Sequence, residues 1–111
     1  MTKDQAPQAP VYDPNGLSAL AYANGFTLWT YKAKHSPFQM IAPGYFREAV
    51  HMLRAGDRIL ANSLDRNGHM TATATLVCSS NDGKDVGVSI VESWPTHENE
   101  ANAGTEMEPA A

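Results

Sequence analysis

The sequence predicts a mainly β domain: a small antiparallel β-sandwich or barrel with one short α-helix and disordered termini. Three observations lead to this fold class. Asn-Gly and Asp-Gly steps recur along the chain, and such steps are common hairpin connections. The segments between them are rich in threonine, valine and aromatic residues, which favour strands. At 111 residues the chain has the size of one domain, which we divide into an arm at 1–14, a core at 15–93 and a tail at 94–111.

The N-terminal arm is expected to be extended, because its prolines remove backbone donors and restrict φ. It is either a disordered tail or an arm that orders on a neighbouring subunit. In the second case Val11 and Tyr12 are its anchoring side chains. The tail at 94–111 is acidic, polar and rich in Ala, Glu and Asn, a composition typical of disorder.

An Asn-Gly turn leads into the strand predicted at 26–33. With a period of two, Trp29 and Tyr31 lie on one face of this strand, and Phe26 and Leu28 lie on the other. Because both faces carry large apolar groups, the strand is either central in a sandwich or covered on its second face by a partner.

Residues 34–43 are expected to form a loop, because prolines interrupt them, and the apolar Phe38 and Met40 must pack against something. Residues 45–54 are predicted to form a helix of about two to three turns, too short to be stable unless it docks on the sheet. Gly56 is placed to end it in a left-handed cap. The apolar residues at i, i+4 and i+7 of this helix are Phe46, Val50 and Leu53.

Further strands are predicted at 58–62, 69–79 and 86–91, between turns that contain glycine. In 69–79, threonine alternates with Met, Ala, Leu and Cys, so one face is apolar and the other carries hydroxyl groups. This pattern suits an antiparallel sheet with one solvated face. The segment at 17–22 is too short to assign to a helix or a strand.

Composition argues against several classes of function. The net charge is −4, and the basic residues are scattered without interleaved aromatics, which argues against nucleic acid as the main partner. No apolar run is long enough to span a membrane, and the polar N-terminus lacks the apolar region of a secretory signal. We therefore expect a soluble protein that is made in the cytosol.

The routes that usually stabilise small domains are mostly closed to this chain. Cys78 is its single cysteine, so no disulfide forms within the chain, and its phase beside Leu76 predicts a buried, inert thiol. The four histidines lie far apart in the sequence, so we expect no metal site and no cofactor. Oligomerisation remains as the further source of stability.

One candidate set for catalysis consists of His35, Ser36 and Asp57. It lacks a Gly-x-Ser-x-Gly elbow and an oxyanion loop, so we predict no enzymatic activity. Asp57, after Gly56, is interpreted as a turn aspartate that accepts hydrogen bonds from local amides, with a functional carboxylate as the alternative. A second acidic cluster lacks the register of a calcium loop and is better explained as a hairpin turn. This cluster consists of Asn81, Asp82 and Asp85 around Gly83.

Two stretches carry a resemblance to a known family. Residues 25–32 read GFTLWTYK, and residues 44–59 read GYFREAVHMLRAGDRI. In this order they resemble small structural proteins of tailed phages, of the head decoration or capsid cement type, over roughly residues 16–92. The loop at 34–43 departs from the family pattern, which leaves its contacts open.

The resemblance implies a β-rich virion protein without chemistry, located on the capsid surface, made in the host cytoplasm and bound to the major capsid protein. It implies a homo-oligomer, with a trimer favoured. The alternative is a tail-fibre or receptor-binding module of a phage particle. We expect interface contacts at Val11, Tyr12, Trp29, Tyr31, Phe38 and Met40.

Overall fold

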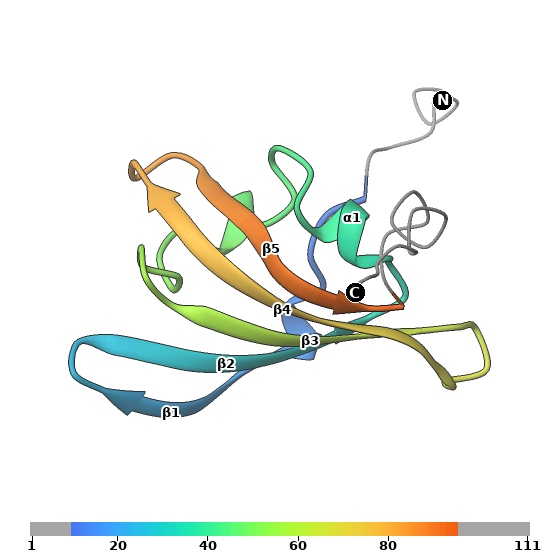
Figure 1. Cartoon of the computed structure of the whole chain (residues 1–111). Coiled ribbons are helices and arrows are strands. Elements are labelled where there is room, and N and C mark those ends of the chain that lie inside the picture. Colours follow the sequence, from blue (N-terminus) through green and yellow to red (C-terminus); the bar gives the residue numbers. More distant parts are fainter. Residues whose placement is uncertain (1–9, 96–111) are drawn as a thin grey trace, which may run out of the picture.

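The computed structural model describes residues 10–95 of the chain. In this range five strands form one sheet in the order β1–β2–β3–β4–β5 (Figure 1). β2 and β3 are parallel, and the other neighbours are antiparallel. The mainly β class is therefore confirmed, in the form of a single mixed sheet where we expected an antiparallel sandwich or barrel. The strands are β1 (Leu17–Ala23), β2 (Phe26–Ala33), β3 (Arg58–Leu64), β4 (Met70–Asn81) and β5 (Val86–Trp94).

A long connection between β2 and β3 forms the second layer of the domain. Two neighbouring parallel strands need a crossover that returns the chain to the same end of the sheet. Residues 34–57 provide it and lie over one face of the sheet (Figure 1). They contain the short helix α1 (Pro37–Met40) and the 3-10 turn η3 (Arg47–Ala49), whereas the 3-10 turn η2 (Pro14–Gly16) precedes β1. We call residues 34–57 the crossover.

The predicted helix over 45–54 is wrong. This segment forms η3 and a series of turns whose bonds mostly join residues three apart, such as Ala49 N to Phe46 O at 2.9 Å. An isolated helix of this length is marginal in water, so packing decides the backbone conformation. Two of the three apolar residues predicted to face inward, Phe46 and Leu53, are buried against the sheet, whereas the third, Val50, is only partly buried.

Within residues 10–95, the one α-helix lies instead in the segment that we expected to be a loop. In α1, the Ser36 hydroxyl accepts a hydrogen bond from the Gln39 amide at 3.2 Å, and the Gln39 side chain accepts one from the Ser36 amide at 2.7 Å. Pro37 occupies the first helical position, where its missing N–H costs nothing. The sequence S-P-x-Q carries this capping box, and the helix buries Met40.

Hairpin turns fall where glycine predicted them. Asn24 and Gly25 join β1 to β2 with φ values of 54° and 85°, a left-handed pair that suits a two-residue hairpin loop. Gly68 and Gly83, with φ of 86° and 88°, lie in the turns that follow β3 and β4. The segment at 17–22, left unassigned from the sequence, belongs to strand β1.

Side chains alternate between the two faces of the sheet, and only one face is covered in the part that the structure describes. Trp29 and Tyr31 are buried under the crossover, as are Leu76 and Cys78, which confirms the phases predicted for their strands. The opposite surface, which we call the open face, carries Leu28 only partly buried. The core under the crossover consists of Tyr12, Leu17, Trp29, Tyr31, Ala33, Met40, Tyr45, Phe46, Ala49, Leu53, Ile59, Ala61, Ala74, Leu76, Cys78 and Val86.

Tyr12 belongs to this core, although we placed residues 1–14 in an arm outside it. Its amide donates to the Tyr45 carbonyl at 2.9 Å, and its ring centroid lies 5.6 Å from that of Phe46. The packed domain therefore begins before residue 15. The expectations of disorder for residues 1–9 and 96–111 lie outside the described residues.

Candidate functional site

Asp57 is the most heavily bonded carboxylate in the described structure, and it is 1% exposed. One oxygen accepts from the Thr27 amide at 2.9 Å, and the other accepts from the Trp29 indole and the Arg54 amide, both at 3.0 Å. The buried indole donor of Trp29 and two part-buried amide donors are thereby satisfied. The carboxylate ties the end of the crossover to β2.

The Asp57 backbone extends this junction to β4. Its carbonyl accepts from the Cys78 amide at 2.8 Å, and the Gly56 amide donates to the Cys78 carbonyl at 2.8 Å. Asp57 therefore connects β2, the Gly56 turn and β4 through one residue. The interpretation as a turn aspartate is correct for the Arg54 amide, but no local pattern indicated the bonds from Thr27 and Trp29 of β2. We assign Asp57 a structural role.

A second polar network, missed in the sequence, is buried under the crossover. The Tyr31 and Tyr45 hydroxyls are 2.6 Å apart, and Nδ1 of His35 lies 2.7 Å from the Tyr45 hydroxyl. The Asp13 amide donates to the Tyr31 hydroxyl at 2.8 Å. Burial raises the pKa of both tyrosines, so their hydroxyls stay protonated over the neutral range. The network joins the N-terminal segment, β2 and the crossover.

The candidate catalytic set of His35, Ser36 and Asp57 is not assembled. The Ser36 hydroxyl caps α1, and His35 bonds to Tyr45. Asp57 instead accepts a hydrogen bond from the Trp29 indole, whereas His35 lies beyond the far end of β2. Roughly 13 Å of strand separates Trp29 from that end at Ala33. No hydrogen bond joins the three side chains within residues 10–95.

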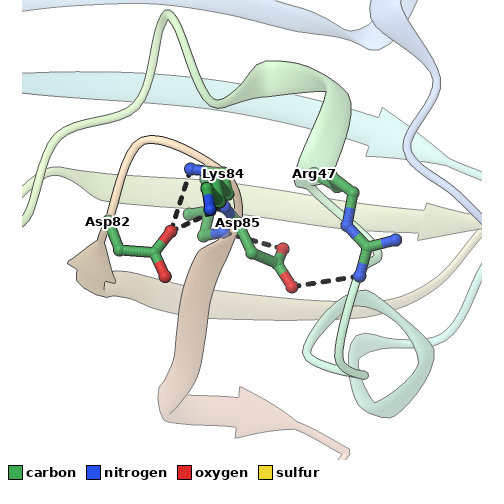
Figure 2. Close-up of polar contacts among 5 residues, drawn as sticks. Arg47, Asp82, Lys84 and Asp85 are labelled. Atoms are coloured by element: carbon green, nitrogen blue, oxygen red, sulfur yellow. Dashed lines mark hydrogen bonds and ion pairs between the residues drawn. The ribbon is translucent and has the colours of Figure 1, made fainter.

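The acidic cluster after β4 forms a hairpin turn. One Asp82 oxygen accepts from the amides of Lys84 and Asp85, both at 2.9 Å (Figure 2). These amides hold the pKa of Asp82 below its ordinary value. The pKa of Asp85 is also lowered, first by the Val86 amide and then by Arg47, whose guanidinium lies 3.1 Å away (Figure 2). This exposed ion pair joins the turn to η3.

The cysteine and the possible metal ligands are the remaining candidates. Cys78 is fully buried, and burial raises the pKa of its thiol, which disfavours the reactive thiolate. Among residues 10–95, no group of three or more His, Cys, Asp or Glu side chains is placed to hold a metal ion. No helix in the same range has the length and apolar character needed to cross a membrane.

The expected interface residues divide into two groups. Tyr12, Trp29, Tyr31 and Met40 are buried in the chain's own core, so their side chains are not presented to a partner. This corrects our expectation for all four: their size and apolar character reflect packing within the domain. The other two, Val11 and Phe38, are exposed on the surface.

A different surface has the character of a protein interface. Pro14 to Tyr31 contains no charged residue, and it folds into η2 and the β1–β2 hairpin at one edge of the sheet (Figure 1). Its side chains Leu20, Tyr22 and Phe26 are 59%, 64% and 52% exposed. Edge strands usually carry charges or proline that block pairing with other chains, and β1 carries neither. We call residues 14–31, which cover η2, β1 and β2 as far as Tyr31, the uncharged hairpin.

The open face carries a polar hollow of about 740 Å³. Its floor is made by outward side chains of β2, β3 and β4, with Asn15, Gly16 and Ser18 at one side. A smaller hollow of about 130 Å³ shares Thr73 and Thr75 with it and extends to Trp94. Trp94 is 60% exposed at the end of β5. Sequence reasoning singled out neither hollow, because they form only when four strands align.

The chain matches no protein-family model, no curated protein and no solved structure. The two sequence stretches at 25–32 and 44–59 have a structural explanation in part. Gly56-Asp57 and Gly44-Tyr45-Phe46 supply residues that join the crossover to the sheet, through the Asp57 carboxylate and the Tyr45 hydroxyl.

Proposed function

We propose that this protein is a virion structural protein that binds the outer surface of a phage capsid and stabilises it, as a decoration or cement protein. Its partner is the major capsid protein, and it acts as a homo-oligomer, with a trimer favoured. It is made in the host cytoplasm and works by binding alone. The observation that carries the proposal is the uncharged hairpin at the edge of the sheet.

The hairpin has the features of a surface that is covered when the protein functions. Leu20 and Tyr22 expose apolar surface to water. Burying that surface on a partner contributes a favourable free energy of roughly 25 cal/mol per Å². Aromatic residues are enriched and charges are depleted at the centres of protein interfaces. The free edge of β1 also offers backbone groups to which a partner strand can add.

A decoration protein does not need a strong single interface. Many copies bind to a symmetric shell, and contacts between copies add avidity that one small surface lacks. The uncharged hairpin is small, so one copy would bind weakly. The avidity of many copies therefore favours a role on a repeating surface.

A direct test is binding to capsids that lack the protein. We expect Leu20→Lys combined with Tyr22→Lys to weaken binding by at least about tenfold, because lysines would be desolvated in the interface. Phe26 is left intact because its ring lies against Gly56. Met70→Lys, at an exposed position at the start of β4, is the matched control. Equal occupancy for the hairpin variant and the control would refute this interface.

The contribution of the N-terminal arm to capsid binding can be measured with a truncation that leaves the core intact. Removing residues 1–14 would also remove Tyr12, so any loss of binding would reflect loss of packing. Removing residues 1–9 leaves every described contact of Tyr12 and Asp13 in place. If the arm contacts capsid or sister subunits, this shorter deletion lowers capsid occupancy without lowering the Tm.

The second candidate is a tail-fibre or receptor-binding module of a phage particle. The observation that favours it is the exposed Trp94 beside the polar hollow, a combination that a purely protein-binding surface does not need. Immunogold labelling of purified particles separates the two functions. Label on heads supports the decoration role, and label confined to tails supports the alternative.

A further inference from the structure

The open face brings side chains of four strands into a single row. The strand register places Lys32 beside Asn62, Asn62 beside Thr73, and Thr73 beside Trp94. Residues paired in this way point to the same side of the sheet. The row therefore runs across three strand spacings, roughly 14 Å, and ends at an exposed indole.

A second row lies next to it. Thr30 of β2 is beside Leu60, Leu60 is beside Thr75, and Thr75 is beside Glu92 of β5. The two rows make the floor of the 740 Å³ hollow and of its extension toward Trp94. This volume is in the range of about 300–1,000 Å³ that is usual for small-ligand sites.

Several polar groups in these rows have no partner in the described residues. The side chains of Lys32, Asn62, Thr75 and Glu92 make no hydrogen bond or ion pair there, and neither does the indole N–H of Trp94. Thr73 and Thr30 differ, because their hydroxyls donate to the Ala61 carbonyl at 3.0 Å and to the Ser18 carbonyl at 3.4 Å. The free groups include both donors and acceptors, and they stand on strands that hold them at fixed spacing.

These features select one class of ligand. The two charges of the rows, on Lys32 and Glu92, have opposite signs, which disfavours a polyanion such as nucleic acid. Leu60 is the one aliphatic side chain in the two rows, so a lipid chain would lack an apolar channel. A chain of sugar rings suits the face, because each hydroxyl both donates and accepts, and the apolar side of a ring stacks on an indole.

We propose that the open face binds a neutral oligosaccharide, with a pyranose ring stacked on Trp94 and further sugar hydroxyls bonded to Asn62, Thr75 and Glu92. The row length fits several linked rings better than one. The hollow borders the uncharged hairpin at Ser18 and Thr30, but the proposed sugar contacts lie on β3, β4 and β5, so the site does not depend on the proposed capsid role. Each of the two proposals can fail while the other stands.

The test is an NMR titration of the full chain with maltotriose, cellotriose and triacetylchitotriose in separate experiments. We expect at least one of them to shift the Trp94 indole signal and the amide signals of Asn62, Thr73 and Thr75. Trp94→Ala should weaken that binding by about tenfold or more, because the stacking surface is lost. Thr75→Val removes one hydroxyl at constant shape and should weaken it by about threefold or more.

Tyr22→Ala is the control, because Tyr22 is an equally exposed aromatic residue in the uncharged hairpin. It should leave the titration unchanged, and the Tm of each variant checks that it folds. The proposal is overturned if none of the three sugars shifts these signals, or if Trp94→Ala binds as tightly as the parent. It is also overturned if the same signals shift with protein concentration alone, since a second copy would then occupy the face.

Discussion

The two faces of the sheet come from the same strands, but they differ in almost every property. Under the crossover, aromatic rings, a buried carboxylate and a tyrosine pair fill the space, and their polar groups are bonded. On the open face, hydroxyl, amide and charged side chains point outward from the described sheet, many of them unpaired. The contacts that stabilise the domain therefore lie mainly on the covered face. The open face and the hairpin edge remain as the surfaces on which binding is proposed.

Within one strand, the contrast follows from the period of two. In β3, Ile59 is fully buried, whereas the next residue, Leu60, is 41% exposed. Both are aliphatic, so chemistry alone does not separate them. Their positions relative to the crossover separate them. Substitutions at the two positions can measure how much more the buried residue contributes to stability.

The largest expected effect is at the carboxylate that joins the two layers. Asp57→Ala leaves the amides of Thr27 and Arg54 and the indole of Trp29 without an acceptor, and we expect the free energy of unfolding to fall by roughly 3–5 kcal/mol. Urea denaturation measures this change. If the variant does not fold, Asp57→Asn should retain part of the network and lose roughly 1–3 kcal/mol.

Asp65→Ala is the matched control for this prediction. Asp65 also accepts two backbone hydrogen bonds in a turn, from Asn67 and His69, but its bonds are exposed to water. We expect Asp65→Ala to lower the free energy of unfolding by about 1 kcal/mol. A loss equal to that of Asp57→Ala would show that burial on the covered face is not what makes Asp57 important.

The neighbouring pair in β3 should give the next largest difference. Ile59→Ala creates a cavity under the crossover and should lower the free energy of unfolding by about 2–5 kcal/mol. Leu60→Ala removes the same kind of group from the open face and should cost less than about 1 kcal/mol. Thermal or urea unfolding of the two variants measures the two losses of stability. Similar losses would mean that the open face is packed against something in solution.

The tyrosine network should contribute less than Asp57. Tyr45→Phe removes the hydrogen bonds to Tyr31 and His35 while keeping the ring, and we expect a loss of about 1–2 kcal/mol. Because burial raises the pKa of Tyr45 in the folded state, its contribution is present below the ordinary tyrosine pKa of about 10 and is lost as pH rises above it. The variant should therefore lose less stability than the parent in alkaline urea titrations.

Tyr22→Phe provides the control for that experiment. Tyr22 is exposed in the hairpin, so removing its hydroxyl should leave the free energy of unfolding unchanged. An equal effect at both tyrosines would contradict a special role for the buried network.

The smallest expected effect is at the exposed turn shown in Figure 2. Arg47→Ala should raise the pKa of Asp85 toward its ordinary value, although the Val86 amide will still hold it below that value. Because the folded-state pKa is lowered, the contribution of Asp85 is present above about pH 4 and fades as the pH falls through the folded pKa. Carboxyl NMR titration measures this shift. Arg66→Ala, in another turn, should leave the Asp85 titration unchanged.

Local features of this fold were readable from the sequence because they depend on a few adjacent residues. Asn24-Gly25 forms a hairpin turn because these residues adopt the left-handed conformation at little cost. The threonine alternation of β4 placed Leu76 on the buried face because the strand period is two. The capping box at Ser36 is equally local, although the prolines around it led us to predict a loop.

Other features required the tertiary structure because they join residues that are distant in the sequence. The apolar spacing of Phe46 and Leu53 marked a buried face, but only packing against the sheet made that segment a 3-10 turn in place of an α-helix. Asp57 looked like a turn residue until β2 supplied its other donors. The burial of Asp57 likewise depends on the packing of distant segments around it.

The sequence alone therefore determined that the chain forms strands joined by tight turns, because propensity and periodicity act over a few residues. Tertiary structure decided that β2 and β3 pair in parallel and that the crossover covers only one face. It also moved Tyr12 and Trp29 from an expected interface into the core, and it placed Trp94 beside Thr73 on the open face. Those outcomes depend on which distant segments meet, and no local pattern encodes that.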